Sequence, residues 1–213
     1  MMKKRFAALA LCCLLVLTAG CSGGENDPAD ASPAETAATT NTVGAYPLVP
    51  YTQYASGGVA SQLDAVILFK NSNSTFTRYQ VAFISCTCRD AASNYRSVMY
   101  VELLNTKETA GEAAIRSISF GQMDHYTVGM WGDSDPIYGQ PEYTAQYMDE
   151  HFVQKLVGKT KDQIDAWEGY GSTVEGIDAV SGATVSSSNI VSVLKSLFAY
   201  HAEHYYADKQ QTP

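Results

Sequence analysis

The residues with the clearest chemical capacity lie between Asp178 and Thr184, in the sequence Asp-Ala-Val-Ser-Gly-Ala-Thr. Thr184 supplies a hydroxyl that can form an ester with phosphorus, although threonine is a weak nucleophile until a base or a transferase activates it. Gly182 and Ala183 are small, so they leave room for a bulky phosphate donor. Asp178 adds carboxylate oxygens, which suit magnesium. The pattern predicts a phosphoester site on Thr184, with Ser181 as a further polar position.

The segments on both sides of this motif determine where the hydroxyl would lie. Residues 173–180 predict a strand that enters the motif, and residues 184–205 predict a helix that leaves it. The first amides of a helix have no partners within it and favour a phosphate group. An alternative is that Ser181 and Thr184 only cap the helix, since both residue types are preferred there for backbone reasons. The predicted helix has one apolar face, formed by Ile190, Val193, Leu194, Leu197, Phe198 and His201.

The preceding part of the chain predicts a sheet followed by helices. Pro141 begins a helix over residues 141–157, which Gly158 ends. Thr160 then begins a shorter helix through Trp167, with the spacing of a capping box. The order of elements predicts a single α+β domain, in which an antiparallel sheet packs against the C-terminal helices. Runs of β-forming residues indicate four strands, at residues 63–70, 78–87, 95–104 and 114–120.

Two of these strands have side chains that alternate between assigned faces. In the strand at residues 78–87, we expect Tyr79, Val81, Phe83 and Ser85 to share one face. In the strand at residues 114–120, we expect Ile115, Ser117 and Ser119 to alternate with Arg116, Ile118 and Phe120.

The N-terminal residues predict export and lipidation. A short basic stretch is followed by an apolar run that is too short to span a bilayer as a mature helix. Leu-Thr-Ala-Gly-Cys, ending at Cys21, resembles a bacterial lipobox. We therefore predict a lipoprotein signal peptide at residues 1–20 and a lipidated Cys21 followed by a flexible tether to residue 45. The domain then occupies residues 46–208. The alternatives are an ordinary secretory signal or an uncleaved anchor.

Composition limits the partners of the domain. The chain has 14 basic and 22 acidic residues and a formal net charge of −8. Three of the basic residues lie in the predicted signal peptide, so the mature chain keeps 11 basic and 22 acidic residues, a net charge of −11. Nucleic acid and anionic membrane surfaces repel such a protein. We expect no nucleic-acid partner, and membrane attachment through the lipid anchor alone.

The motif from Asp178 to Thr184 resembles the FMN-binding domain family, which includes peripheral subunits of the Rnf and sodium-pumping NADH:quinone oxidoreductase complexes. The family pattern Asp-x-x-Ser/Thr-Gly-Ala-Thr is matched at Asp178, Ser181, Gly182, Ala183 and Thr184. The resemblance covers about residues 90 to 205. It implies FMN bound covalently to Thr184, installed from FAD by an exported ApbE-type flavin transferase.

The same resemblance implies an electron carrier at the extracytoplasmic face of the membrane, similar to flavinylated lipoproteins of extracellular electron transfer. FMN would take electrons from a membrane donor and pass them to an extracellular acceptor. The sequence has no catalytic triad or substrate-activating acid–base pair, so we expect a carrier rather than an enzyme with its own substrate. The alternatives are a lipid-anchored module that binds a solute or a partner without redox activity, and a reductase for one small molecule.

Other residues have weaker chemical signals. Cys86 and Cys88 lie on one face of a predicted strand. We interpret them either as buried free thiols or as a pair with a redox or metal-binding role. His201 and His204 are one helical turn apart but show no third metal ligand, so we expect His201 at the edge of the core and His204 in solvent. The segment Asp133-Ser134-Asp135 is interpreted as an acidic turn, not a calcium loop. We expect Trp131 and Tyr138 to be flavin neighbours. No metal site is predicted.

Overall fold

The structure is a computed structural model, and it describes residues 45–86, 95–120, 145–177 and 183–207. The chain divides into two compact units, Met1–Thr42 and Val43–Pro213, and every described residue belongs to the second. The predicted signal peptide, Cys21 and the tether to residue 44 lie outside the described residues and stay predictions. Among the described helices, none is long and apolar enough to cross a membrane.

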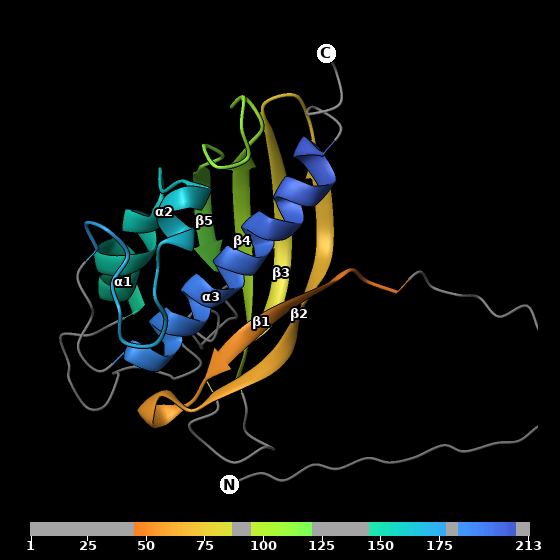
Figure 1. Cartoon of the computed structure of the whole chain (residues 1–213). Helices are drawn as coiled ribbons and strands as arrows, with labels where there is room; N and C mark the ends of the chain where they lie inside the picture. Colours follow the sequence, from red (N-terminus) through yellow and green to blue (C-terminus); the bar gives the residue numbers. More distant parts are fainter. Residues whose placement is uncertain (1–44, 87–94, 121–144, 178–182, 208–213) are drawn as a thin grey trace, which may run out of the picture. The chain divides into compact units, whose positions relative to one another are not determined.

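Five consecutive strands form one antiparallel sheet in the order β1-β2-β3-β4-β5 (Figure 1). Each strand pairs with the next along the chain. The predicted α+β fold with an antiparallel sheet is confirmed. The strands are β1 (Leu48–Tyr54), β2 (Ala60–Ser72), β3 (Phe76–Cys86), β4 (Tyr95–Leu104) and β5 (Ile115–Phe120), and a 3-10 turn, η1 (Ser56–Gly58), joins β1 to β2.

Strand β1 was not predicted, because Pro50 interrupts its pattern of β-forming residues. Proline cannot donate a ladder hydrogen bond and is confined to edge strands or bulges. β1 is such an edge strand. The backbone N–H and C=O of Tyr54 face a helix side chain, Asn189, instead of β2. Pro50 lies four residues before Tyr54, and residues an even number apart in a strand direct their backbone groups to the same side. The Pro50 nitrogen therefore faces the free edge as well, and its lack of an N–H costs the sheet no hydrogen bond.

The helical elements follow the sheet in the chain. The predicted helix at residues 141–157 is helical from Ala145 but changes type twice, and residues 141–144 lie outside the described residues. Gly158 ends it with φ +84°, as predicted. The predicted last helix is confirmed. The elements are α1 (Ala145–Met148), the π-helical η4 (Asp149–Val153), the 3-10 turn η5 (Gln154–Leu156), α2 (Lys161–Asp165), α3 (Thr184–His201) and the π-helical η6 (Ala202–Tyr206).

The core lies between the sheet and α3, which crosses one face of it (Figure 1). The predicted apolar face of α3 is buried, from Ile190 to His201. The predicted inner face of β3 is confirmed, since Tyr79, Val81, Phe83 and Ser85 are all buried. Burial of this apolar surface is the main term that stabilises the domain, at roughly 25 cal/mol per Å².

The face assignment for β5 was wrong. Ile115 and Ile118 are both buried, whereas Ser117 and Ser119 are exposed. A strict alternation cannot place residues three apart on the same face. The register of the β4–β5 pair shifts between Glu102 and Leu103, and a bulge of this kind lets both isoleucines reach the core.

The prediction of a strand at residues 173–180 was also wrong over residues 173–177, the part of it that the structure describes. Residues 173–177 contain no strand. Ile177 donates its backbone N–H to the carbonyl of Val174 at 2.9 Å, and Gly176 has φ +72°. A turn closed by this bond, with glycine in the left-handed region, excludes extended pairing. The motif is therefore entered from a turn.

Thr160 begins α2 with the predicted capping box. Its hydroxyl accepts from the Gln163 N–H at 3.3 Å, and the Gln163 side chain accepts from the Thr160 N–H at 3.1 Å. We predict that Thr160→Ala lowers the free energy of unfolding by about 1 kcal/mol, because an amide of the first turn loses its partner. Urea titration measures this. Thr160→Ser keeps the hydroxyl and serves as the control; an equal loss in both variants would contradict the capping role.

A buried carboxylate links the three neighbouring strands β3, β4 and β5. Glu102 on β4 is about 8% exposed and accepts hydrogen bonds from Arg78 on β3 and Arg116 on β5. Burial alone would raise the pKa of Glu102, but the hydrogen bonds from Arg78, Ser117 and Arg116 lower it below its usual range.

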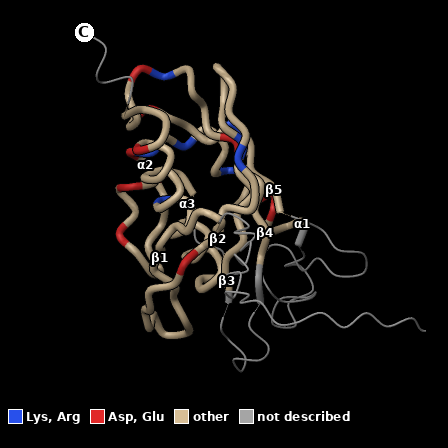
Figure 2. The backbone as a smooth tube through the Cα atoms, turned by 90° about the vertical axis from the view of Figure 1, so that its right-hand side faces the viewer, with Lys and Arg blue, Asp and Glu red and all other residues tan. Residues whose placement is uncertain are grey.

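Figure 2 shows that charged positions gather near α2 and at the ends of strands, while the lower parts of β1 to β3 carry few.

The lowered pKa of Glu102 predicts a specific acid sensitivity. Its contribution to stability is complete above the unfolded-state pKa of about 4.3 and is lost as the pH falls through the lower folded-state pKa. In Glu102→Gln, the free energy of unfolding should therefore vary less with pH below about pH 5. Urea titrations between neutral and acid pH measure this. Glu108→Gln, at an exposed position, is the matched control, and parallel profiles for all three proteins would contradict the prediction.

Candidate functional site

Thr184 is the first residue of α3, and Ala183 is its N-cap. The Ser187 N–H donates to the Ala183 carbonyl at 2.9 Å, which is the first bond of the helix. Thr184 is half-buried, and no described residue makes a hydrogen bond to its hydroxyl. Ala183 is buried, about 5% exposed. Asp178, Ser181 and Gly182, the other members of the motif, lie outside the described residues, so their predicted roles stay predictions.

The first turn of α3 is held by a side chain other than Thr184. The Ser187 hydroxyl donates to the Ala183 carbonyl at 2.9 Å and is 3.3 Å from the Thr184 carbonyl. The interpretation that Thr184 caps the helix is wrong, because it lies within the helix and its hydroxyl accepts no amide of the first turn. That hydroxyl is therefore available for chemistry beside the amides that open the helix.

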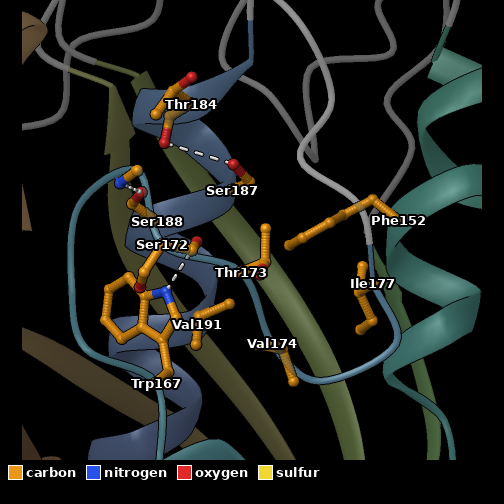
Figure 3. A pocket seen from close by; sticks show the side chains of 11 residues that line it. Phe152, Trp167, Ser172, Thr173, Val174, Ile177, Thr184, Ser187, Ser188 and Val191 are labelled. Atoms are coloured by element: carbon orange, nitrogen blue, oxygen red, sulfur yellow. Dashed lines mark hydrogen bonds between the residues drawn. The ribbon is translucent and has the colours of Figure 1, made fainter.

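A narrow cleft lies below Thr184, between α3 and the segment that follows α2 (Figure 3). Phe152 from η4 and Trp167 supply aromatic side chains. The space that a water molecule can enter is about 20 Å³, so a large ring would lie across the mouth of the cleft and not inside it. The lining residues are Phe152, Trp167, Gly171, Ser172, Thr173, Val174, Ile177, Thr184, Ser187, Ser188 and Val191.

The wall opposite α3 is fixed by hydrogen bonds. The Trp167 indole N–H donates to the Ser172 carbonyl at 3.2 Å, which closes the loop between them. The Ser172 hydroxyl donates to the Gly169 carbonyl at 2.6 Å, and the Gly171 N–H donates weakly to the Ser188 hydroxyl at 3.5 Å. The loop is therefore tied both to itself and to the second turn of α3.

Asn189 attaches the same part of α3 to the sheet. Its side chain is fully buried and lies in the second turn of α3. The side-chain oxygen accepts from the Tyr54 N–H at 2.7 Å, and the side-chain amide donates to the carbonyls of Tyr54 at 3.0 Å and Ser85 at 2.9 Å. The Tyr54 ring in turn contacts Trp167 edge-on, with centroids 6.0 Å apart. Asn189 thus positions α3 and, through Tyr54, the aromatic wall of the cleft.

The expected flavin neighbours Trp131 and Tyr138 lie outside the described residues and stay predictions. The structure instead places Phe152 and Trp167 at the cleft. In the sequence, Phe152 falls within the predicted helix at residues 141–157, and Trp167 is the end of the shorter predicted helix that begins at Thr160. Their positions depend on long-range packing, so no local spacing identifies them. Asn189 gave no signal either, apart from being a polar residue within an apolar helix pattern.

The remaining predicted positions are partly described. His201 is fully buried, and its Nδ1 lies 2.9 Å from the Tyr79 hydroxyl, where burial raises the pKa of Tyr79. His204 is exposed and its ring stacks on Tyr200. No group of three metal-ligating side chains occurs within the described ranges. The Cys86 side chain, Cys88 and residues 133–135 lie outside the description.

The domain is thus an α+β protein with an available hydroxyl at a helix N-terminus, above an aromatic-walled cleft. Residues 93–199 match the FMN-binding domain family, and the chain belongs to this family. It is a flavin-binding protein with FMN as its cofactor. Comparisons with curated proteins and with solved structures gave no match.

The described residues fit FMN. The ring system requires an apolar and aromatic wall, which Phe152, Trp167 and the aliphatic residues of the cleft supply. The phosphate requires donors, which the opening amides of α3 supply. Thr184 lies between these two environments, since it begins α3 and lines the cleft (Figure 3).

Proposed function

We propose that this protein is a lipid-anchored, extracytoplasmic electron carrier with FMN esterified to Thr184. One observation supports this most: the Thr184 hydroxyl has no partner among the described residues and lies at the start of α3, above the cleft. The match of residues 93–199 to the FMN-binding domain supports the cofactor. The covalent bond and the location are supported by the motif and by the predicted lipobox at Cys21.

The attachment step is a phosphoryl transfer from FAD. The Thr184 oxygen attacks the FMN phosphorus, the bond between the two phosphates of FAD breaks, AMP leaves, and the hydroxyl proton passes to a base of the transferase. An external ApbE-type flavin transferase supplies the activation. The open position of Thr184 is suited to such an enzyme, and Asp178 is the proposed ligand of its metal ion.

Bound FMN supplies reversible electron transfer, and the protein controls its position and surroundings. The first amides of α3 hold the phosphate, while the Phe152 and Trp167 side chains limit how the ring can lie. An ester bond keeps the cofactor from diffusing away outside the cell. The proposed partners are a membrane electron donor and an extracellular acceptor, which the tether after Cys21 lets the domain reach in turn.

The proposal is tested by producing the full chain with and without a flavin transferase. The expected result is a denatured band that fluoresces as flavin, with a mass increase equal to FMN less one water, only when the transferase is present. Anaerobic reduction followed by reoxidation with an external acceptor then tests electron carrying. If the wild-type chain acquires no flavin, a lipid-anchored module that binds a solute or a partner without redox activity becomes the better account.

A further inference from the structure

A second and larger cavity lies on the other side of Trp167. It runs between the edge strand β1, α2 and the outer face of α3, and we name it the β1–α3 groove. Its volume is about 570 Å³, within the range of about 300–1,000 Å³ typical of small-molecule sites. Trp167 lines both this groove and the cleft below Thr184. A ligand in the groove would therefore be separated from the flavin side by one indole ring.

The floor of the groove contains a hydroxyl that makes no hydrogen bond to any described residue. Ser192 on α3 is about 6% exposed, so more than nine-tenths of it is buried, and its side chain has no hydrogen-bond partner in the described structure. Ser196, one turn further along α3, adds a second hydroxyl. A hydroxyl that opens on a cavity and has no partner in the protein can donate to and accept from a ligand.

Lys195 brings a positive charge that no carboxylate of the described residues neutralises. Its ammonium donates to the carbonyls of Asp165 at 2.8 Å and Trp167 at 3.4 Å. The Asp165 carboxylate is already paired with Lys161. Glu168 also lines the groove, but it is exposed. Two carbonyls occupy two of the three ammonium protons, so one proton and the full charge stay available to an anion.

The remaining wall is aromatic. Tyr54 is half-buried at the end of β1. Its ring contacts the rings of Trp167 and Tyr170, with centroid separations of 6.0 Å and 5.7 Å. Aromatic surfaces of this kind favour a planar ligand. The groove thus combines aromatic rings with a cation and two hydroxyls.

We propose that the β1–α3 groove binds a small aromatic anion, a quinone that carries a carboxylate or sulfonate group, as the acceptor of electrons from the FMN side of Trp167. The anion lies against Lys195 and the serine hydroxyls, and the ring lies against Tyr54 and Trp167. This inference rests on the proposed function. Two electrons from reduced FMN, which becomes oxidised, and two protons from FMN and solvent convert the quinone to a hydroquinone.

Binding can be measured without any flavin. The chain has two tryptophans, so Trp131→Phe leaves Trp167 as the single fluorescent reporter. Titration of this unflavinylated protein with anthraquinone-2-sulfonate should give saturable quenching. Lys195→Gln should weaken binding about tenfold or more, since a hydrogen bond to a charged group contributes about 1.5–3 kcal/mol. The uncharged 2-(hydroxymethyl)anthraquinone should bind both proteins within about twofold of each other.

A steric pair of variants provides a control that does not depend on Lys195. Ser196→Tyr fills the groove and should abolish saturable quenching. Ser119→Tyr introduces the same side chain at an exposed site on β5 and should leave it unchanged. Thermal unfolding confirms that each variant is folded. In flavinylated protein, reoxidation by anthraquinone-2-sulfonate should saturate with quinone concentration in the wild type and stay linear in Ser196→Tyr.

Two results would overturn the inference: non-saturable quenching in the wild-type groove, or saturable quenching that all groove variants retain. Neither result affects flavinylation of Thr184, which is measured separately. Conversely, a chain that binds the sulfonate but never acquires flavin would refute the proposed function while leaving the binding site in place.

Discussion

Thr184→Ala abolishes covalent flavin attachment, with a loss of at least about 100-fold in flavin fluorescence of the denatured protein. The expected loss is nearly complete because the ester oxygen itself is removed and no other group can form the same bond. In the structure, the neighbouring Ser187 hydroxyl is bound to backbone carbonyls of the first turn. Intact mass and in-gel fluorescence after production with the transferase measure the effect.

Two matched variants separate chemistry from folding. Ser187→Ala removes a hydroxyl from the same turn and should keep flavin attachment, because its oxygen serves the helix and not the ester. Thr184→Ser keeps a hydroxyl at the attachment position and should retain part of the labelling. Flavin retained on Thr184→Ala, or lost equally from Ser187→Ala, would contradict the assignment of the attachment site.

Strands with strong alternation could be predicted from the sequence, because burial of one face imposes the period of two. The buried face of β3 and the bounds of β4 follow from side chains that the pattern already identifies. The last helix was predictable for the same reason, with its apolar stripe from Ile190 to His201. The burial of both Ile115 and Ile118 on β5 could not be predicted, because a bulge changes the alternation of side chains and its position is set by pairing with β4.

The segment before the motif shows how a single glycine can override propensity. Thr173, Val174 and Ile177 are β-forming residues, but Gly176 adopts φ +72° and allows a turn that buries Val174 and Ile177 instead. Both then line the cleft. The predicted helix start at Thr184 is confirmed, whereas the prediction that a strand precedes it was wrong over residues 173–177.

The aromatic wall of the site could not be predicted, because it depends on contacts between distant segments. Trp167 follows a short helix with a recognisable capping box, yet its place beside α3 is set by loop hydrogen bonds and by Tyr54 on β1. β1 itself was not predicted. A site wall that depends on an unpredicted edge strand has no signal in local sequence patterns.

Asn189→Leu should lower the free energy of unfolding by about 3 kcal/mol, the second large effect that we expect. The substitution keeps the number and branching of the side-chain heavy atoms but removes three hydrogen bonds. The Tyr54 N–H and the Ser85 carbonyl then lose their partners in a buried setting, where each unsatisfied group costs about 1–3 kcal/mol. Urea titration measures the loss. Asn71→Leu, at an exposed position on β2, is the matched control and should change stability by less than about 0.5 kcal/mol.

Asn189→Asp tests whether the loss comes from the missing donor. An ionised carboxylate can still accept from the Tyr54 N–H, but it cannot donate to the carbonyls of Tyr54 and Ser85 and it repels both. Burial would raise the pKa of the new carboxyl, so its protonated form, which can donate, becomes populated as the pH falls. Stability of Asn189→Asp relative to wild type should therefore recover at acid pH, whereas that of Asn189→Leu should not. Equal acid responses in the two variants would show that Asn189 acts through packing alone. The same comparison on flavinylated protein, measured by circular dichroism of the flavin band, would show whether the positions of the Tyr54 and Trp167 side chains depend on Asn189.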